Sequence, residues 1–108
     1  MSEPPILMTV AERRIDYDSA QHFQEQLLRA LGDGSAVLIV DFSGVESISS
    51  VGLRALVVAA KKSTAGNGKI VVSGLRPLVR EVFEISRFDA LFPLYDSVDA
   101  ARDALGAG

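Results

Sequence analysis

The chain contains no cysteine and no tryptophan among its 108 residues. Without cysteine, disulfide bonds, thiolate metal sites and a cysteine nucleophile are excluded, and a reducing compartment suits the protein. The longest apolar runs, residues 36–40 and 55–60, are far shorter than the roughly 20 residues that a membrane-spanning helix needs. Residues 1–5 lack the basic residues and the apolar run of a signal peptide. We therefore expect a cytoplasmic protein without direct membrane insertion.

An excess of positive charge is also missing, because 11 Lys and Arg stand against 14 Asp and Glu, for a formal net charge of −3. Nucleic-acid-binding proteins commonly carry a basic patch with aromatic side chains that stack on bases. The basic pairs Arg13-Arg14 and Lys61-Lys62 are far apart in the sequence. We expect each pair to belong to a solvated face, and we expect no nucleic-acid partner.

The residues that are present have the balance of one globular domain, with 48% apolar and 23% charged residues. We expect a single domain over residues 1–108, with flexible ends at residues 1–5 and 106–108. Strand-like apolar runs alternate with segments of helical periodicity. We predict strands over residues 6–11, 36–42, 69–73 and 92–95, and helices over residues 20–31, 51–63, 77–85 and 98–105.

This alternation is typical of an α/β protein whose mostly parallel sheet is covered by helices. Sites in such sheets lie at the carboxyl ends of strands, where helices begin. The junctions at residues 15–19 and 41–52 are therefore the predicted places for a site. At the first of them, Asp16, Asp18 and Ser19 offer oxygens that could cap the first helix.

Two serines, Ser49 and Ser50, fall at the start of the second predicted helix. Unpaired backbone N–H groups and the positive end of the helix dipole gather there. From composition alone, one serine caps the helix and the other is only exposed, because serine is a preferred cap residue.

The stretch from Asp41 to Leu56 resembles the signature of the STAS domain, which commonly reads Asp-(Phe/Leu)-Ser-x-Val-x-x-(Ile/Met)-Asp-Ser-(Ser/Thr/Ala)-Gly-Leu-x-x-Leu. Residues 15–20, 74–83 and 88–97 also resemble the family, so the resemblance covers most of the chain. It implies a SpoIIAA-like fold, with a mixed, mostly parallel sheet of four to five strands and about four helices. The matching signature positions are Asp41, Phe42, Ser43, Val45, Ile48, Ser50, Gly52, Leu53 and Leu56.

The resemblance to bacterial anti-sigma factor antagonists implies a function as well. Such a protein, without catalytic activity or cofactor, sequesters an anti-sigma factor that is also a serine kinase of the histidine-kinase-like ATPase type, and so frees a sigma factor. By position, Ser50 is the serine that this kinase phosphorylates and that a separate serine phosphatase restores. Asp16 corresponds to the aspartate beside that serine, and Gly52 and Leu53 to the helix start that the kinase contacts.

Three residues depart from the family pattern. Ser49 replaces the motif aspartate, as in a sub-group that reads Ile-Ser-Ser-x-Gly, and Val51 stands where Ser or Thr is frequent. Arg13 stands where a glycine usually precedes the acidic pair. The segment before residue 11 is short for the two strands with which the family often begins. The change at Ser49 concerns kinase recognition and leaves the acceptor hydroxyl in place.

Arg54 and Val58 follow Ser50 at helical spacing and so lie on one side of the second helix. We expect Arg54 to pair partly with a phosphate on Ser50; the alternatives are a solvated Arg54 and a Val58 in the core. The expected partner surface comprises Asp16, Ser49, Ser50, Val51, Gly52, Leu53, Arg54 and Val58.

Other functions remain open at this point. An enzyme with Ser50 as nucleophile lacks support, because Gly-x-Ser-x-Gly is absent and the single histidine, His22, is expected on the surface. A receiver-type metal site could form from Asp16, Asp18 and Asp41, although Asp18 more simply caps a helix and Asp41 fits the motif. The stronger alternative is a non-enzymatic STAS accessory subunit of a lipid or anion transporter, or a signalling scaffold, without a phosphate switch.

Overall fold

The computed structural model describes residues 4–106. The predicted flexibility of residues 1–3 and 107–108 lies outside the described part of the chain. Gly106, at the start of the C-terminal end that was expected to be flexible, is the last residue of a helix. No described helix combines the length and the apolar character needed to cross a bilayer.

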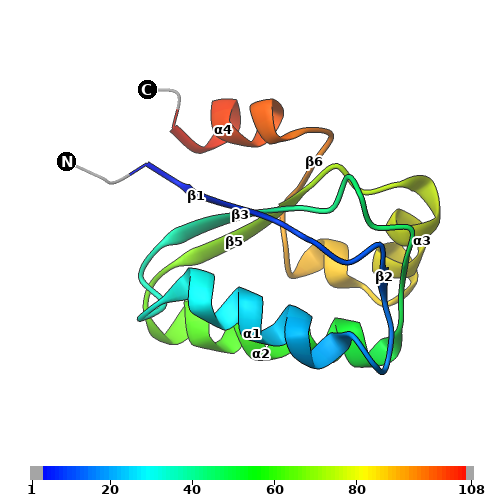
Figure 1. Ribbon diagram of the computed structural model, residues 1–108. Coiled ribbons are helices and arrows are strands. Elements are labelled where there is room, and N and C mark those ends of the chain that lie inside the picture. Colours follow the sequence, from blue (N-terminus) through cyan, green and yellow to red (C-terminus); the bar gives the residue numbers. More distant parts are fainter. Residues whose placement is uncertain (1–3, 107–108) are drawn as a thin grey trace.

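Four parallel strands form the central sheet, in the order β1-β3-β5-β6 (Figure 1). The two central strands, β3 and β5, are buried because helices cover both faces, as their continuous apolar sequences predicted. A mixed, mostly parallel sheet was expected, and all of the strand pairs in residues 4–106 are parallel. The sheet strands are β1 (Ile6–Thr9), β3 (Val37–Asp41), β5 (Lys69–Ser73) and β6 (Leu94–Tyr95).

A second, separate sheet has only two strands, β2 (Arg14–Ile15) and β4 (Ser47–Ile48). Neither strand was predicted, because two residues are too few to show an alternating pattern. The short 3₁₀ helix Phe88–Ala90 was not predicted either.

The four α-helices of the described residues divide unequally between the faces of the main sheet. The main core packs against α1 (Ala20–Leu31), α2 (Ser50–Ala65) and α3 (Pro77–Ile85). On the opposite face lies α4 (Val98–Gly106), over a small core of Ile39, Val71 and Ala101 (Figure 1).

Phe42, which follows β3, packs between α1 and α3 in the main core. Its ring meets those of Phe23 and Phe83 edge to face, with centroids 6.0 and 5.6 Å apart. Such pairs contribute about 0.5–1.5 kcal/mol each beyond their burial. The motif phenylalanine therefore fixes α1 and α3 against the end of β3, from which the chain continues toward α2.

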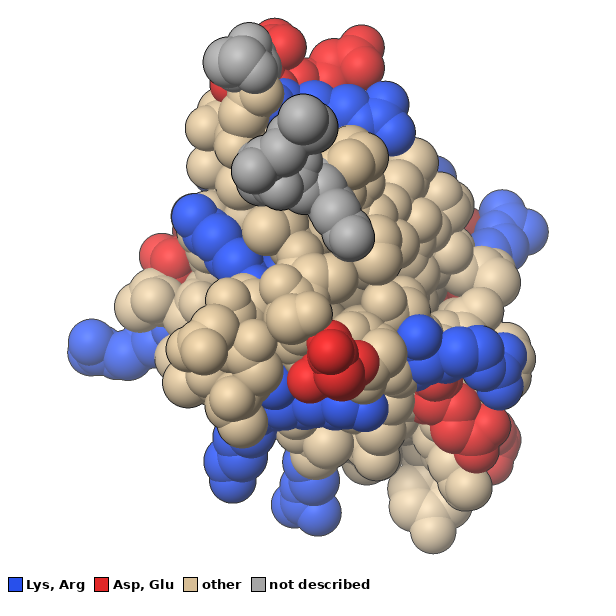
Figure 2. All heavy atoms as spheres, turned by 90° about the vertical axis from the view of Figure 1, so that its left-hand side faces the viewer, with Lys and Arg blue, Asp and Glu red and all other residues tan. Residues whose placement is uncertain are grey.

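Charges of both signs are interspersed on the molecular face in Figure 2, which shows no continuous basic patch on that side. Arg13, from one of the two basic pairs, lies 3.0 Å from the carboxylate of Glu46. This exposed ion pair adds little stability.

Candidate functional site

The pairing of β2 with β4 joins the two junctions at which a site was predicted. Arg14 lies beside Ser47 and Ile15 beside Ile48. The Ser49 N–H donates to the Ile15 carbonyl oxygen over 2.7 Å. The turn before α1 and the loop before α2 consequently form one continuous surface.

The two serines at the start of α2 have different roles. Ser49 is the N-cap residue, with extended backbone angles (φ −93°, ψ 173°), and its Oγ accepts a hydrogen bond from the Gly52 N–H at 3.4 Å. That distance is long for a hydrogen bond, so we expect a modest contribution to stability. Ser50 is the first helical residue and is exposed to solvent. The cap function thus belongs to Ser49, and the hydroxyl of Ser50 remains accessible for chemistry.

Gly52 lets the first turn of α2 lie directly on the small β2–β4 sheet. A Cβ at this position would lie 2.6 Å from Cγ2 of Ile15 and 2.8 Å from Cγ1 of Ile48, so no other residue fits without movement. Gly52 itself is buried, and Leu53 is half-buried against the main core. These two residues therefore set the position of the helix start beneath the exposed Ser50.

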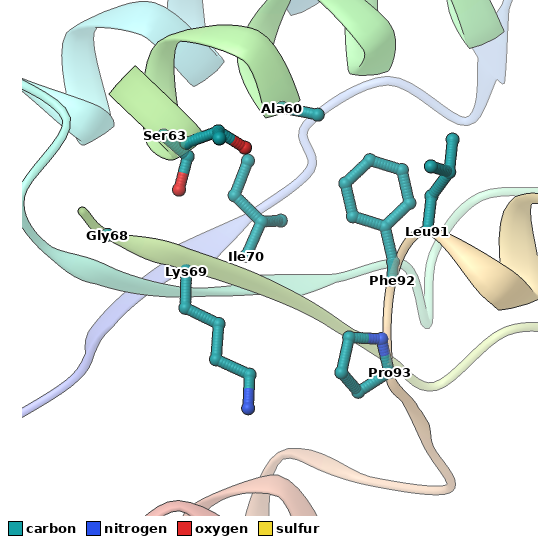
Figure 3. A pocket seen from close by; sticks show the side chains of 9 residues that line it. Ala60, Ser63, Gly68, Lys69, Ile70, Leu91, Phe92 and Pro93 are labelled. Carbon is teal, nitrogen blue, oxygen red and sulfur yellow. The ribbon is translucent and has the colours of Figure 1, made fainter. Parts of the chain in front are cut away.

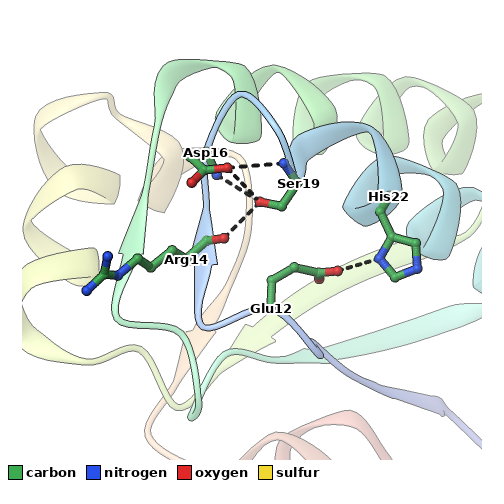
Figure 4. Close-up of polar contacts among 5 residues, drawn as sticks. All are labelled: Glu12, Arg14, Asp16, Ser19 and His22. Atoms are coloured by element: carbon green, nitrogen blue, oxygen red, sulfur yellow. Dashed lines mark hydrogen bonds and ion pairs between the residues drawn. The ribbon is translucent and has the colours of Figure 1, made fainter.

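Asp16 organises the turn that lies beside this helix start (Figure 4). Its Oδ1 accepts the N–H groups of Asp18 and Ser19, each at 3.1 Å, and lies 3.2 Å from the Ser19 hydroxyl oxygen. These bonds, that of the Ser19 N–H first, hold the pKa of Asp16 below its ordinary value. Asp16 is therefore a fixed, exposed anion at neutral pH.

The prediction that Asp18 caps α1 is wrong. The N-cap residue is Ser19, whose side chain makes no capping bond, and its hydroxyl donates instead to the Arg14 carbonyl oxygen at 2.8 Å. The Asp16 carboxylate accepts the N–H groups of Asp18 and Ser19, which are two and three residues after it, within the reach of an Asx turn.

A shallow hollow of about 280 Å³ separates the starts of α1 and α2 and is bordered by Gln21 and Gln24. Tyr17, 81% exposed, and Val51, 37% exposed, bring apolar surface to its rim. Arg54 also lines it. Sequence reasoning had not named Tyr17, although an aromatic residue between two aspartates at a predicted junction was a usable signal.

The outer side of α2 continues the same surface. Arg54 is exposed, and Val58 is half-buried without belonging to the hydrophobic core clusters. Ser50, Arg54 and Val58 thus run along one side of the helix, as their spacing predicted.

His22 lies away from this surface. Its Nδ1 contacts Oε2 of Glu12 (Figure 4), on the flank of α1 opposite Gln21 and Gln24, which face α2. A serine–histidine pair therefore does not form at Ser50.

Asp41 is engaged elsewhere too, since its Oδ1 accepts the Ser43 N–H at 2.9 Å in the turn after β3. Within residues 4–106, no three His, Cys, Asp or Glu side chains gather in a group that could hold a metal ion.

A second hollow, of about 180 Å³, lies at the other end of α2 (Figure 3). Ser63, Ile70 and Phe92 are among its lining residues, and the buried Ser63 hydroxyl has no hydrogen-bond partner. Thirteen residues of helix, at 1.5 Å each, put Ser63 about 20 Å from Ser50. This hollow is separate from the surface around Ser50.

The surface around Ser50, with its capped and exposed serine pair beside a fixed aspartate, can be compared with known proteins. A family model for the STAS domain matches residues 3–101. The chain belongs to the STAS domain family. The candidate anti-sigma factor antagonist BtrV of Bordetella bronchiseptica is 32% identical over 99 residues, which cover 92% of this chain and 85% of BtrV.

A solved structure of another protein has the same fold. The anti-sigma factor antagonist of Mycobacterium paratuberculosis superposes with a TM-score of 0.79 at 28% identity, covering 92% of this chain and 83% of that one. The predicted family and STAS fold are confirmed. The STAS chain is thus similar to proteins that are named anti-sigma factor antagonists.

The fold also occurs in a transporter. Murine Slc26a9, an anion transporter, superposes with a TM-score of 0.75 at 18% identity; the match covers 88% of this chain but 16% of the transporter. A similarity at this identity shows a shared fold and nothing further.

Proposed function

We propose that this STAS domain is an anti-sigma factor antagonist, a non-catalytic module of the cytoplasm whose binding is switched by phosphorylation of Ser50. Its partner would be an anti-sigma factor with serine kinase activity of the histidine-kinase-like ATPase type, and a serine phosphatase would reverse the modification. The observation that carries the proposal is that the two serines at the start of α2 have different roles. Ser49 caps the helix, whereas Ser50 is exposed to solvent.

The partner surface combines apolar contacts with charge. Tyr17 and Val51 supply exposed apolar area at the centre, and Asp16 and Arg54 supply opposite charges around it. Aromatic side chains with a polar rim are typical of the energetically important part of protein interfaces. We therefore extend the expected surface by one residue, Tyr17.

Phosphorylation would act on binding and leave folding intact. A phosphoserine adds about −1.5 to −2 charges at neutral pH. At the first position of α2, the helix dipole favours such a charge by about 0.3–1 kcal/mol. In the complex, the same charge would have to lose its water beneath the partner, beside the anionic Asp16 turn. The modification therefore weakens the complex and spares the fold.

The test is the affinity of three variants for the anti-sigma kinase that the same genome encodes, measured by titration calorimetry. We expect Ser50→Asp to lose about 3 kcal/mol or more, at least a hundredfold in Kd, because a charge is buried without a partner. Ser50→Ala should bind within a few-fold of the wild type and escape phosphorylation. Ser86→Asp, which places the same charge on the exposed end of α3, is the matched control and should bind normally.

Equal binding by wild type and Ser50→Asp would exclude the phosphate switch. Mass spectrometry after incubation with kinase and ATP should place the phosphate on Ser50, whereas modification of Ser49 would require a different acceptor and loss of the helix cap.

The contribution of Arg54 to the phosphate switch can be measured separately from that of Ser50. If Arg54 pairs with the phosphate, Arg54→Ala should change the ratio between the affinities of the unphosphorylated and phosphorylated protein. An unchanged ratio would remove Arg54 from the mechanism, because coupling between two groups appears as non-additivity.

A transporter subunit or a signalling scaffold without a phosphate switch is the alternative. In that case Ser50 would be only a contact residue, and transporter subunits would co-purify with the protein in place of a kinase.

A further inference from the structure

The outer side of β1 is an open sheet edge. β1 stands at the end of the strand order, and within residues 4–106 it pairs only with β3 (Figure 1). The Val10 N–H donates to the Asp41 carbonyl oxygen at 3.1 Å, so it points toward β3. Because these directions alternate along a strand, the N–H and carbonyl groups of Leu7 and Thr9 point away from the sheet.

This edge has two of the usual protections against pairing, a short strand of four residues and a proline directly before it, but it lacks charge. Residues 4–11 carry no charged side chain, although an edge lysine is the common safeguard. Ile6 and Leu7, on opposite faces of the strand, are 41% and 40% exposed. Pro5 removes one outward N–H group but leaves its carbonyl oxygen as an acceptor.

We propose that two copies of this chain associate through their β1 edges, antiparallel, about a two-fold axis perpendicular to the sheet. In this register Leu7 of one copy lies opposite Thr9 of the other. The outward N–H and carbonyl groups of both residues then bond across the axis. The main sheet continues from one copy into the next.

A second copy suits this edge because, when two identical strands pair antiparallel, the residues that lie opposite one another come from the same segment and must be compatible. A charged strand would bring like charges face to face, which destabilises a sheet, whereas residues 4–11 are neutral. The two-fold axis keeps each side chain on its own face, so Leu7 packs with Thr9 and Ile6 packs with Val10 of the second copy.

The dimer surface is independent of the surface around Ser50. On α1, Gln21 and Gln24 line the hollow beside α2, while His22 contacts Glu12, which follows β1 in the chain. The surface around Ser50 therefore remains exposed on each of the two copies in the dimer. One short strand pair is a small interface, so we expect weak, concentration-dependent association.

Sedimentation velocity over a concentration series tests this. The wild type should double its molar mass as its concentration rises, and Leu7→Lys should stay monomeric throughout. Leu78→Lys, which makes the same change at a 66% exposed leucine on α3, is the matched control and should dimerise as the wild type does. If Leu7→Lys fails to fold, Thr9→Lys at the other outward residue replaces it.

Amide exchange supplies a second readout. In the dimer, the amides of Leu7 and Thr9 should exchange at least tenfold more slowly, and those of Met8 and Val10 should stay unchanged because β3 already protects them. A wild type that remains monomeric at every concentration, or a dimer that persists in Leu7→Lys and Thr9→Lys, would overturn the proposal.

Discussion

Replacing Gly52 with alanine separates the local preference of a helix from the packing that the tertiary structure imposes. In an exposed helix, Gly→Ala would gain about 1 kcal/mol. Here the new Cβ would lie 2.6 Å from Ile15 Cγ2 and 2.8 Å from Ile48 Cγ1, neither of which is the far end of a flexible side chain. Overpacking of this kind costs about 1–3 kcal/mol.

The net result should be a loss of up to about 2 kcal/mol in the free energy of unfolding, since the packing cost offsets or exceeds the gain in helix propensity. Urea denaturation followed by far-UV circular dichroism measures it, with an unchanged m-value. A loss of about 2 kcal/mol corresponds to a fall in Tm of about 8–16 °C for a domain of this length.

Gly44→Ala is the matched control. A Cβ at Gly44 meets nothing within 4 Å, so this variant should be as stable as the wild type or gain about 0.4–1 kcal/mol. If Gly52→Ala were as stable as Gly44→Ala, the close contact between α2 and the β2–β4 sheet would not constrain the start of the helix, and the account of how Ser50 is positioned would fail.

Three further measurements address the site and the second hollow. Ser49→Ala should lower the free energy of unfolding by about 0.5–1 kcal/mol through loss of the cap, whereas Ser50→Ala should change it by less than about 0.5 kcal/mol; equal losses would contradict the assigned roles. The Asp16 carboxyl should titrate below its ordinary pKa of 3.8, and Ser19→Ala should raise that pKa part of the way back, as followed by NMR. Since the folded pKa is lowered, the stabilising effect of Asp16 should be present above the ordinary value and disappear as the pH falls through the folded value. Ser63→Ala should stabilise the protein by about 1 kcal/mol, because it removes a buried hydroxyl without a partner and improves helix propensity; a loss in thermal unfolding would show that the hydroxyl is bonded.

Most elements of the fold could be predicted because their apolar patterns are long enough to read. The strand at 69–73 has its predicted bounds, and the third helix begins at Pro77 as predicted. The observed α2 is longer than the predicted helix by one residue at its start and two at its end. The strand predicted over residues 6–11 ends at Thr9, because the chain leaves the sheet there and turns toward β2.

Elements whose sequence patterns are too short to read were not predicted. β2 and β4 have two residues each, and their pairing depends on a contact between Arg14 and Ser47 across a long separation in sequence. Asp16, Asp18 and Ser19 were all candidates for the cap of α1, and only the shape of the turn places Ser19 at the N-cap position and Asp16 as the acceptor within the turn.

The sequence by itself determined an α/β domain with two serines at a helix start, because apolar periodicity, turn residues and the Asp41–Leu56 motif are local properties of the chain. The tertiary structure alone decided which serine caps and which is exposed, and why Gly52 must be glycine. It also placed Tyr17 beside Val51 and left the outer edge of β1 open. These features arise from contacts between segments distant in sequence, whose geometry is fixed only once the sheet and helices pack together.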